Sequence, residues 1–238
     1  MDAIATIRSC YSQRFGIPRQ PGLVDSAVAA IEFEPTSDNA LALRDLEAFS
    51  HLWVVFVFHR QHYKRFKPLV QPPRLGGKQT KGVYATRSPN RPNPIGLSVV
   101  TLQQVVFGKD QHRVFVTGGD FLDSTPVLDI KPYVSFVDAI PNAISDWATP
   151  LQDSLEVAWN SEALLSLNSI KPNCDPVAFG LHGLKKLIEQ TLSQDPRPAH
   201  ERGRDGKVDQ HWGVMIGPVN VRFRVQGGIV IINTIETR

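Results

Sequence analysis

Short runs of β-branched and aromatic residues, separated by turns rich in glycine and proline, dominate the first part of the chain. Such runs are typical of strands, because these side chains pack well on a pleated surface. The run Leu52–Phe58 is apolar throughout, and we expect it to be a fully buried strand. The expected strands cover residues 4–7, 27–33, 52–58, 83–86, 97–107, 112–118 and 127–133. This pattern predicts a mainly β protein in which residues 1–145 form a single β-barrel.

The pattern changes after this region. Residues 141–150 resemble a linker bounded by prolines. Asp175 followed by Pro176 is a favourable helix start, and leucine and isoleucine then recur at helical spacing as far as Leu192. Strands are expected at residues 212–216, 221–225 and 229–235. We therefore predict a small α+β domain over residues 155–238.

A segment rich in proline and arginine stands out at residues 87–98, Arg-Ser-Pro-Asn-Arg-Pro-Asn-Pro-Ile-Gly-Leu-Ser. Each proline fixes its own φ and biases the preceding residue toward an extended conformation. We therefore expect a stiff loop that is neither a helix nor a central strand, with Gly96 permitting a tight turn or a close backbone approach. A pre-ordered loop that carries Arg87 and Arg91 suits a small anionic or zwitterionic ligand. The alternative is a surface turn whose arginines face water.

Charge is distributed unevenly along the chain. The net charge is only +3, but no Asp or Glu occurs between Ala48 and Lys109, a stretch that holds ten lysines and arginines. A basic surface of this kind favours a polyanionic partner, and a solvated basic face is the alternative. Within residues 221–225 the apolar side chains share one strand face, and Arg222 and Arg224 share the other, where they either grip phosphates or are simply solvated.

The cysteines and the apolar runs bear on the compartment. Cys10 and Cys174 lie far apart without metal-ligand spacing, which is typical of free thiols in a reducing cytosol. The N-terminus shows no secretory signal pattern, and the longest apolar run is far shorter than the ~20 residues of a membrane-spanning helix. We therefore expect a cytoplasmic protein without a membrane partner.

Several common catalytic motifs are missing from the sequence. No Gly-x-Gly-x-x-Gly motif follows a predicted strand and no Gly-Lys-Ser/Thr loop occurs, so the usual nucleotide-binding fold is not expected. The zinc motifs His-Glu-x-x-His and Cys-x-x-Cys do not occur either. Asp120, Asp123 and Asp129 are suited to a magnesium ion, but an Asx-turn at Asp123 is the simpler interpretation. We therefore expect no metal.

Residues 87–98 resemble the hallmark segment of the TsaA-like proteins, which are S-adenosylmethionine-dependent tRNA (adenine-37-N6)-methyltransferases. Asp195-Pro196-Arg197-Pro198 resembles a motif in the smaller C-terminal domain of the longer bacterial members. The other stretches that fit the family are residues 15–23, 53–59, 123–133 and 220–222. The resemblance covers nearly the whole chain, and the twelve-residue segment is highly specific.

The resemblance implies a fold, a reaction and a set of contacts. The fold is a single β-barrel, active as a homodimer with S-adenosyl-L-methionine near the interface. The reaction is methylation of N6 in N6-threonylcarbamoyladenosine at position 37, beside the anticodon of threonine tRNAs. The implied cofactor-binding residues are Pro18, Arg19, Gln20, His59, Arg60, Arg87, Leu97, Asp123, Ser124, Thr125 and Pro126. Ser124 stands where many members have glycine.

The chemistry of this cofactor assigns expected roles. We expect Arg87 or Arg19 to hold the carboxylate, Asp123 the ribose hydroxyls or the ammonium, and Leu97 the adenine. A proton must leave the attacking nitrogen, and Asp195 is a candidate acceptor. The expected tRNA-binding residues are Arg91, Arg197, Arg222 and Arg224.

Three other functions are compatible with the residues. One is a non-catalytic RNA-binding module, which would not take up S-adenosylmethionine. Another is a metal-dependent hydrolase built on Asp120, Asp123 and Asp129, which a chelator would inactivate. The third is a methyltransferase that acts on a different nucleobase or on a metabolite.

Overall fold

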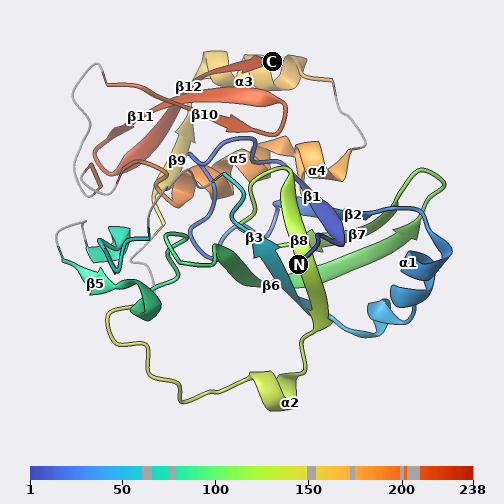
Figure 1. The fold of residues 1–238 in the computed structure, drawn as a ribbon. Coiled ribbons are helices and arrows are strands. Elements are labelled where there is room, and N and C mark those ends of the chain that lie inside the picture. The colour runs from blue at the N-terminus through green and yellow to red at the C-terminus, as the bar shows by residue number, and fades with distance from the viewer. Residues whose placement is uncertain are drawn as a thin grey trace.

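The protein is described by a computed structural model, over residues 1–60, 66–75, 79–148, 154–171, 175–198, 201–202 and 210–237. Six antiparallel strands close into a barrel in the order β1-β2-β7-β6-β3-β8 (Figure 1). These strands are β1 (Ala5–Ser9), β2 (Val28–Phe33), β3 (His51–Val57), β6 (Ile95–Phe107), β7 (His112–Thr117) and β8 (Thr125–Pro132). A small C-terminal sheet domain follows, so the predicted fold class is confirmed.

Strand β3 is not the fully buried strand that its apolar sequence predicted. Leu52, Val54 and Phe56 are buried in the barrel interior, whereas the side chains between them are only half-buried. A closed barrel has a single interior, so successive side chains of each strand must alternate between inside and outside. On the outside, Trp53 packs against Tyr133 with ring centroids 5.8 Å apart.

The proline-rich segment has two parts. Residues 87–94 form a loop, as expected. Strand β6 begins at Ile95, two residues before the predicted start at Leu97, because no proline follows Pro94 and Ile95–Ser98 pair with β3. The predicted strand at residues 83–86 is also wrong, since Val83–Ala85 form a 3₁₀-helix. The Thr86 hydroxyl donates to the Val83 carbonyl, 2.8 Å away, which stabilises this turn.

Smaller elements surround the barrel. They are α1 (Ser37–Ala42), α2 (Ser135–Asp138), β4 (Leu69–Val70), β5 (Lys81–Gly82) and 3₁₀-helices at Leu46–Ala48 and Pro73–Leu75. Residues 141–148 of the expected linker form neither helix nor strand, and its last two residues lie outside the described part of the chain.

The described residues of the C-terminal domain form a four-stranded sheet, in the order β10-β11-β12-β9, and three helices. Strand β9 pairs with β12 in parallel, and neither β9 nor α3 was predicted. The expected helix from Asp175 to Leu192 is split into α4 and α5, because Gly180 and Gly183 adopt positive φ values of 76° and 88°. The elements are β9 (Glu156–Trp159), α3 (Ser161–Ser169), α4 (Pro176–Phe179), α5 (Leu184–Ser193), β10 (Trp212–Ile216), β11 (Val219–Gln226) and β12 (Ile229–Thr237).

The two parts share a hydrophobic core. Helices α4 and α5 lie between the barrel and the C-terminal sheet (Figure 1). Tyr11 and Val24, from the segment between β1 and β2, are buried in one cluster with Leu187 and Ile188 of α5. The Tyr11 hydroxyl lies 3.1 Å from Thr191 Oγ1 in this core. Among the described residues, no helix has the length and apolarity needed to cross a bilayer.

Candidate functional site

A cleft of about 610 Å³ opens on the side of the barrel. Its wall combines the segment between β1 and β2, the end of β3, the loop before β6 and the crossing from β7 to β8. Eight of the eleven predicted cofactor-binding residues line it: Pro18, Arg19, Gln20, His59, Arg60, Arg87, Leu97 and Thr125. Residues far apart in the sequence therefore converge on one hollow.

The remaining three predicted residues, Asp123, Ser124 and Pro126, lie outside the cleft lining, next to Leu122 and Thr125, and their cofactor contacts stay a prediction. The Asp123 carboxylate accepts from the Ser9 amide at 2.8 Å and from the Ser124 hydroxyl at 3.1 Å, so it joins β1 to the turn before β8 instead of forming the expected Asx-turn. Ser124 has a φ of 63°. A glycine adopts this conformation without strain, which explains why glycine is common here in the TsaA-like proteins.

Two contacts hold the loops at the cleft together. Arg87 Nη1 donates to Gln20 Oε1 at 2.8 Å and so joins the loop before β6 to the segment between β1 and β2. Gly96 lies opposite Phe56 in the β3–β6 ladder, and a Cβ at residue 96 would come within 2.2 Å of the Phe56 ring. The glycine is needed here for close packing of the strand on a core aromatic ring.

His59 and Thr125 face each other at the end of β3. The distance from Thr125 Oγ1 to His59 Nδ1 is 3.4 Å, and the hydroxyl also donates to the Leu122 carbonyl at 2.6 Å. Burial, and then the charge of Arg60, lower the pKa of His59, which favours a neutral imidazole at neutral pH. Among the described residues, no group hydrogen-bonds the buried Nε2 atom of His59. A ligand in the cleft can supply that partner.

Asp120 is a further residue of the site, which the sequence indicated only as a candidate metal ligand. It lines the cleft together with five arginines, and it is the one acidic side chain among the described residues of the lining. The buried Ser98 hydroxyl donates to Asp120 Oδ1 at 2.6 Å. Burial raises the pKa of Asp120, while the Ser98 hydrogen bond and the charge of Arg87 oppose the rise.

The four arginines predicted to bind tRNA have different environments. Arg91 lines the cleft, but its Nη1 donates to the carbonyls of Thr86 at 2.8 Å and Val83 at 3.2 Å, so it stabilises the loop. Arg222 is exposed and pairs with Glu236 at 3.1 Å. Arg224 lies on the same outer face of β11, as the alternation predicted, with its Nε buried and without a hydrogen bond among the described residues.

Arg197 is only 2% exposed, so the prediction of a surface contact to tRNA is wrong for this residue. Its guanidinium lies over the ring of Trp212 at 5.4 Å and forms two bonds, of 2.7 and 2.8 Å, with the carboxylate of Asp195. Asp195 is therefore held in an ion pair and lies outside the cleft lining, and its role as the proton acceptor stays a prediction.

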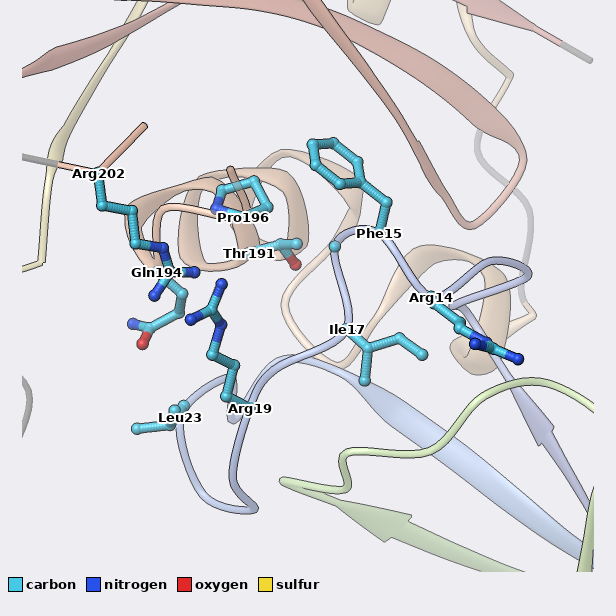
Figure 2. Close-up of a pocket in the computed structure, with 10 residues that line it drawn as sticks. Arg14, Phe15, Ile17, Arg19, Leu23, Thr191, Gln194, Pro196 and Arg202 are labelled. Atoms are coloured by element: carbon cyan, nitrogen blue, oxygen red, sulfur yellow. The ribbon is translucent and has the colours of Figure 1, made fainter. Parts of the chain in front are cut away.

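A second pocket, the junction pocket, has a volume of about 400 Å³ and lies where the barrel meets the C-terminal domain (Figure 2). It shares Arg14, Ile17 and Arg19 with the cleft. Thr191, Gln194, Pro196 and Arg202 complete its wall from the C-terminal side. The pocket thus extends the cleft toward the second domain.

The metal-dependent hydrolase is not supported by this geometry. Over the described ranges, no group of three or more His, Cys, Asp or Glu side chains is placed to hold a metal ion. Asp129 instead pairs with Lys131 at 3.0 Å, and Asp123 is bound to Ser9 and Ser124. Cys10 is buried, and burial raises the pKa of its thiol to about 12, whereas Cys174 lies outside the described residues.

Comparisons with known proteins cover the whole architecture. The family model described as the tRNA-methyltransferase O N-terminal domain matches residues 6–139, and the TrmO C-terminal domain model matches residues 152–238. The tRNA (adenine(37)-N6)-methyltransferase of Escherichia coli K12 is 42% identical over 229 residues, which cover 94% of this chain and 92% of that protein. The putative S-adenosylmethionine-dependent methyltransferase RcsF of Pseudomonas aeruginosa is 40% identical, over 88% of this chain and 90% of the relative.

A solved structure agrees with these matches. The crystal structure of TrmO from Pseudomonas aeruginosa superposes with a TM-score of 0.74 at 32% sequence identity, over 99% of this chain and 96% of that chain. The resemblance stated from the sequence is thus confirmed, and the chain belongs to the tRNA-methyltransferase O family.

Proposed function

We propose that this protein is an S-adenosylmethionine-dependent methyltransferase that methylates N6 of N6-threonylcarbamoyladenosine at position 37 of threonine-type tRNA. The relatives' names support the reaction class, the methyl donor and the tRNA position. The observation that carries the proposal is the cleft, in which eight residues of the family's cofactor motifs gather from four separate segments.

The residues of the cleft fit S-adenosylmethionine chemically. Arg87 presents a guanidinium group for a carboxylate, and half-exposed Leu97 presents apolar area for an adenine. The buried Nε2 of His59 needs a hydrogen-bond partner, and the polar groups of a nucleoside can provide one. When bound, the cofactor supplies a methyl group activated by the sulfonium charge.

Asp120 is suited to take the proton that the attacking nitrogen must lose. Its Oδ1 is held by Ser98, which leaves Oδ2 to accept a proton from a group in the cleft. A raised pKa makes its carboxylate a stronger base than that of an ordinary aspartate. Arg87, whose positive charge acts on Asp120, stabilises the ionised form in which the residue can act. Asp120 therefore replaces Asp195 as the proposed proton acceptor.

The partners in this proposal are the anticodon loop of tRNA and a second copy of the chain. A loop base is single-stranded and can be turned into a pocket, and the basic stretch between residues 48 and 109 provides attraction for phosphates. Exposed apolar side chains beside the cleft, including Tyr84, Ile95 and Leu97, favour a homodimer contact there. The proposed location is the cytoplasm, where tRNA is modified.

The test is methyl transfer by the purified full-length chain. Incubation with labelled S-adenosylmethionine and tRNA carrying N6-threonylcarbamoyladenosine should give the N6-methylated nucleoside, identified by mass spectrometry. A chelator should leave the rate unchanged. Heat of binding with S-adenosylmethionine but no methylated nucleoside would redirect the proposal to another acceptor, and the lack of any binding, with or without RNA, would refute it. Light scattering at several concentrations tests the homodimer.

A further inference from the structure

The junction pocket brings two guanidinium groups together from different domains. Arg19 belongs to the segment between β1 and β2, and Arg202 belongs to the C-terminal domain. Figure 2 shows their guanidinium groups pointing toward one another with Gln194 beside them, whereas Arg14 points away. Like charges do not approach one another unless the surrounding structure holds them.

One backbone carbonyl holds both groups in place. The Arg197 carbonyl accepts from Arg19 Nη2 at 3.2 Å and from Arg202 Nε at 3.1 Å. The Nη2 of Arg202 also donates to the carbonyl of Asp195. Backbone carbonyls of the motif Asp195–Pro198 therefore hold Arg19 of the barrel and Arg202 of the C-terminal domain side by side.

The electrostatics of this arrangement favour an anion. Burial, and then the neighbouring charge of Arg19, lower the pKa of Arg202 to about 10. The nearby Asp195 carboxylate pairs with Arg197 through two hydrogen bonds, and its charge opposes the lowering of the Arg202 pKa without cancelling it. A half-buried pair of like charges is stabilised when an oxyanion enters between them. The stabilisation by an oxyanion depends on the charges of the two guanidinium groups. It does not require that either group lack a hydrogen-bond partner.

We infer that the junction pocket binds an oxyanion of the substrate RNA, either the carboxylate of the modified adenosine or a phosphodiester of the anticodon loop, between Arg19 and Arg202. This inference rests on the proposed function and extends it to a substrate-binding site. Guanidinium forks match the planar geometry of a carboxylate and the oxygens of a phosphate.

The position of the pocket distinguishes an RNA oxyanion from the cofactor's own carboxylate. Every described residue that lines the cleft lies between Arg14 and Thr125 and thus belongs to the barrel. The junction pocket adds residues of the C-terminal domain and shares Arg14, Ile17 and Arg19 with the cleft. A ligand that occupies both hollows is larger than the cofactor and reaches across two domains, as a tRNA loop does.

The test compares the variants Arg202→Gln and Arg202→Lys with the matched control Lys185→Gln. Lys185 is an exposed cation of α5 that lines neither hollow, so the control removes one positive charge from the same domain. Binding of the full chain is measured at fixed salt to tRNA with and without the threonylcarbamoyl group. Calorimetry with S-adenosylmethionine and a thermal midpoint are recorded for each variant.

Arg202→Gln should weaken binding of RNA by about ten- to a hundredfold, the usual effect of losing a charge-assisted hydrogen bond, and leave the affinity for S-adenosylmethionine unchanged. A loss confined to modified tRNA identifies the carboxylate, and an equal loss for both RNAs identifies a phosphate. Arg202→Lys, which keeps the charge, should recover part of the loss. Unchanged binding to both RNAs, a loss of cofactor affinity instead, or a loss that simply follows a lowered thermal midpoint would each overturn the inference. Failure of the wild type to methylate tRNA would count against the proposed methyl acceptor, not against the anion site, because the binding measurements do not require turnover.

Discussion

Asp120 shows how a single side chain acquires a role from its surroundings. It faces a cleft lined with five arginines and is partly buried beside the barrel core. Its Oδ1 atom accepts a hydrogen bond from the hydroxyl of Ser98 at 2.6 Å. Burial penalises the charged form, and the surrounding positive charge and the hydrogen bond favour it. The balance leaves an aspartate that is more basic than usual and is still open to a ligand.

We predict that Asp120→Asn lowers kcat by about 10²- to 10⁴-fold, the usual contribution of a general base. The affinity for S-adenosylmethionine should change little, because the amide keeps the shape of the carboxylate and can still accept from Ser98. In the wild type, kcat should rise with pH as Asp120 loses its proton, through an apparent pKa above that of an ordinary aspartate. This rising limb should disappear in the variant. A kcat–pH profile of both proteins measures these effects.

Two further variants control this result. Ser98→Ala removes a hydrogen bond that stabilises the carboxylate, so the rising limb should move to higher pH. Asp129→Asn alters an exposed carboxylate paired with Lys131 and should leave the profile unchanged. A full rising limb in Asp120→Asn would exclude Asp120 as the proton acceptor.

The stability of Asp120→Asn separates chemistry from unfolding. A carboxyl whose pKa is raised in the folded state contributes stability at low pH, and this contribution is lost as the pH rises through the folded-state pKa. At neutral pH the ionised Asp120 therefore destabilises the fold, and the asparagine should be at least as stable. A thermal midpoint of Asp120→Asn below that of the wild type at pH 7 would contradict this prediction.

Eight of the eleven cofactor-binding residues predicted from the sequence line one cleft, but the sequence could not rank the acids. Asp120, Asp123 and Asp129 lie within ten positions, and the sequence does not show which of them faces the cleft. That choice depends on how residues 118–124 cross from β7 to β8, which is decided by tertiary packing. For the same reason, nothing in Asp195–Pro198 indicated that Arg197 is buried against Trp212.

At the scale of elements, the loop before β6 is held by Arg91 as well as by its prolines. The guanidinium of Arg91 bonds the carbonyls of Val83 and Thr86 and lies over the Tyr84 ring at 5.6 Å. These contacts close the 3₁₀-helix at Val83–Ala85 onto the loop that carries Arg87. Proline content predicted a loop here, but the contacts of Arg91 with residues five to eight positions earlier were not readable from the sequence.

We predict that Arg91→Ala weakens the affinity for S-adenosylmethionine by roughly tenfold, because the loss of charge-assisted bonds of this kind loosens the loop beneath Arg87. Arg91→Lys should not restore it, since a single ammonium lacks the planar fork and its stacking on Tyr84. The slope of log affinity for tRNA against log salt should stay unchanged in both variants. Calorimetry and salt-dependent RNA binding measure the two effects.

A direct phosphate contact at Arg91 would give the opposite pattern. Arg91→Ala would then reduce the salt slope by about one, Arg91→Lys would restore it, and cofactor binding would be intact in both. Lys109→Ala, in the exposed turn between β6 and β7, is the matched loss of a basic residue that should leave cofactor binding intact.

At the scale of the whole molecule, the barrel and the C-terminal domain are joined by a continuous core. Segment 10–27 leaves the barrel, contributes Tyr11 and Val24 to the core of the second domain and carries Arg19 to both hollows. The sequence predicted two units from the change in pattern near residue 150. The shared core was not predicted, because apolar periodicity identifies buried residues without saying which partner buries them.

The shared core predicts that the barrel and the C-terminal domain unfold together. Tyr11→Phe removes the hydroxyl that contacts Thr191 in the buried junction, and it should lower the free energy of unfolding by about 1 kcal/mol. Hydrogen exchange with increasing urea, followed by mass spectrometry, should show peptides of β3 and β12 losing protection at the same urea concentration. The variant should shift both peptides equally, whereas the control Tyr133→Phe on the barrel exterior should shift neither. If β12 alone lost protection earlier in Tyr11→Phe, the domains would fold independently, and the junction pocket would be a contact between two separate units instead of part of one cooperative structure.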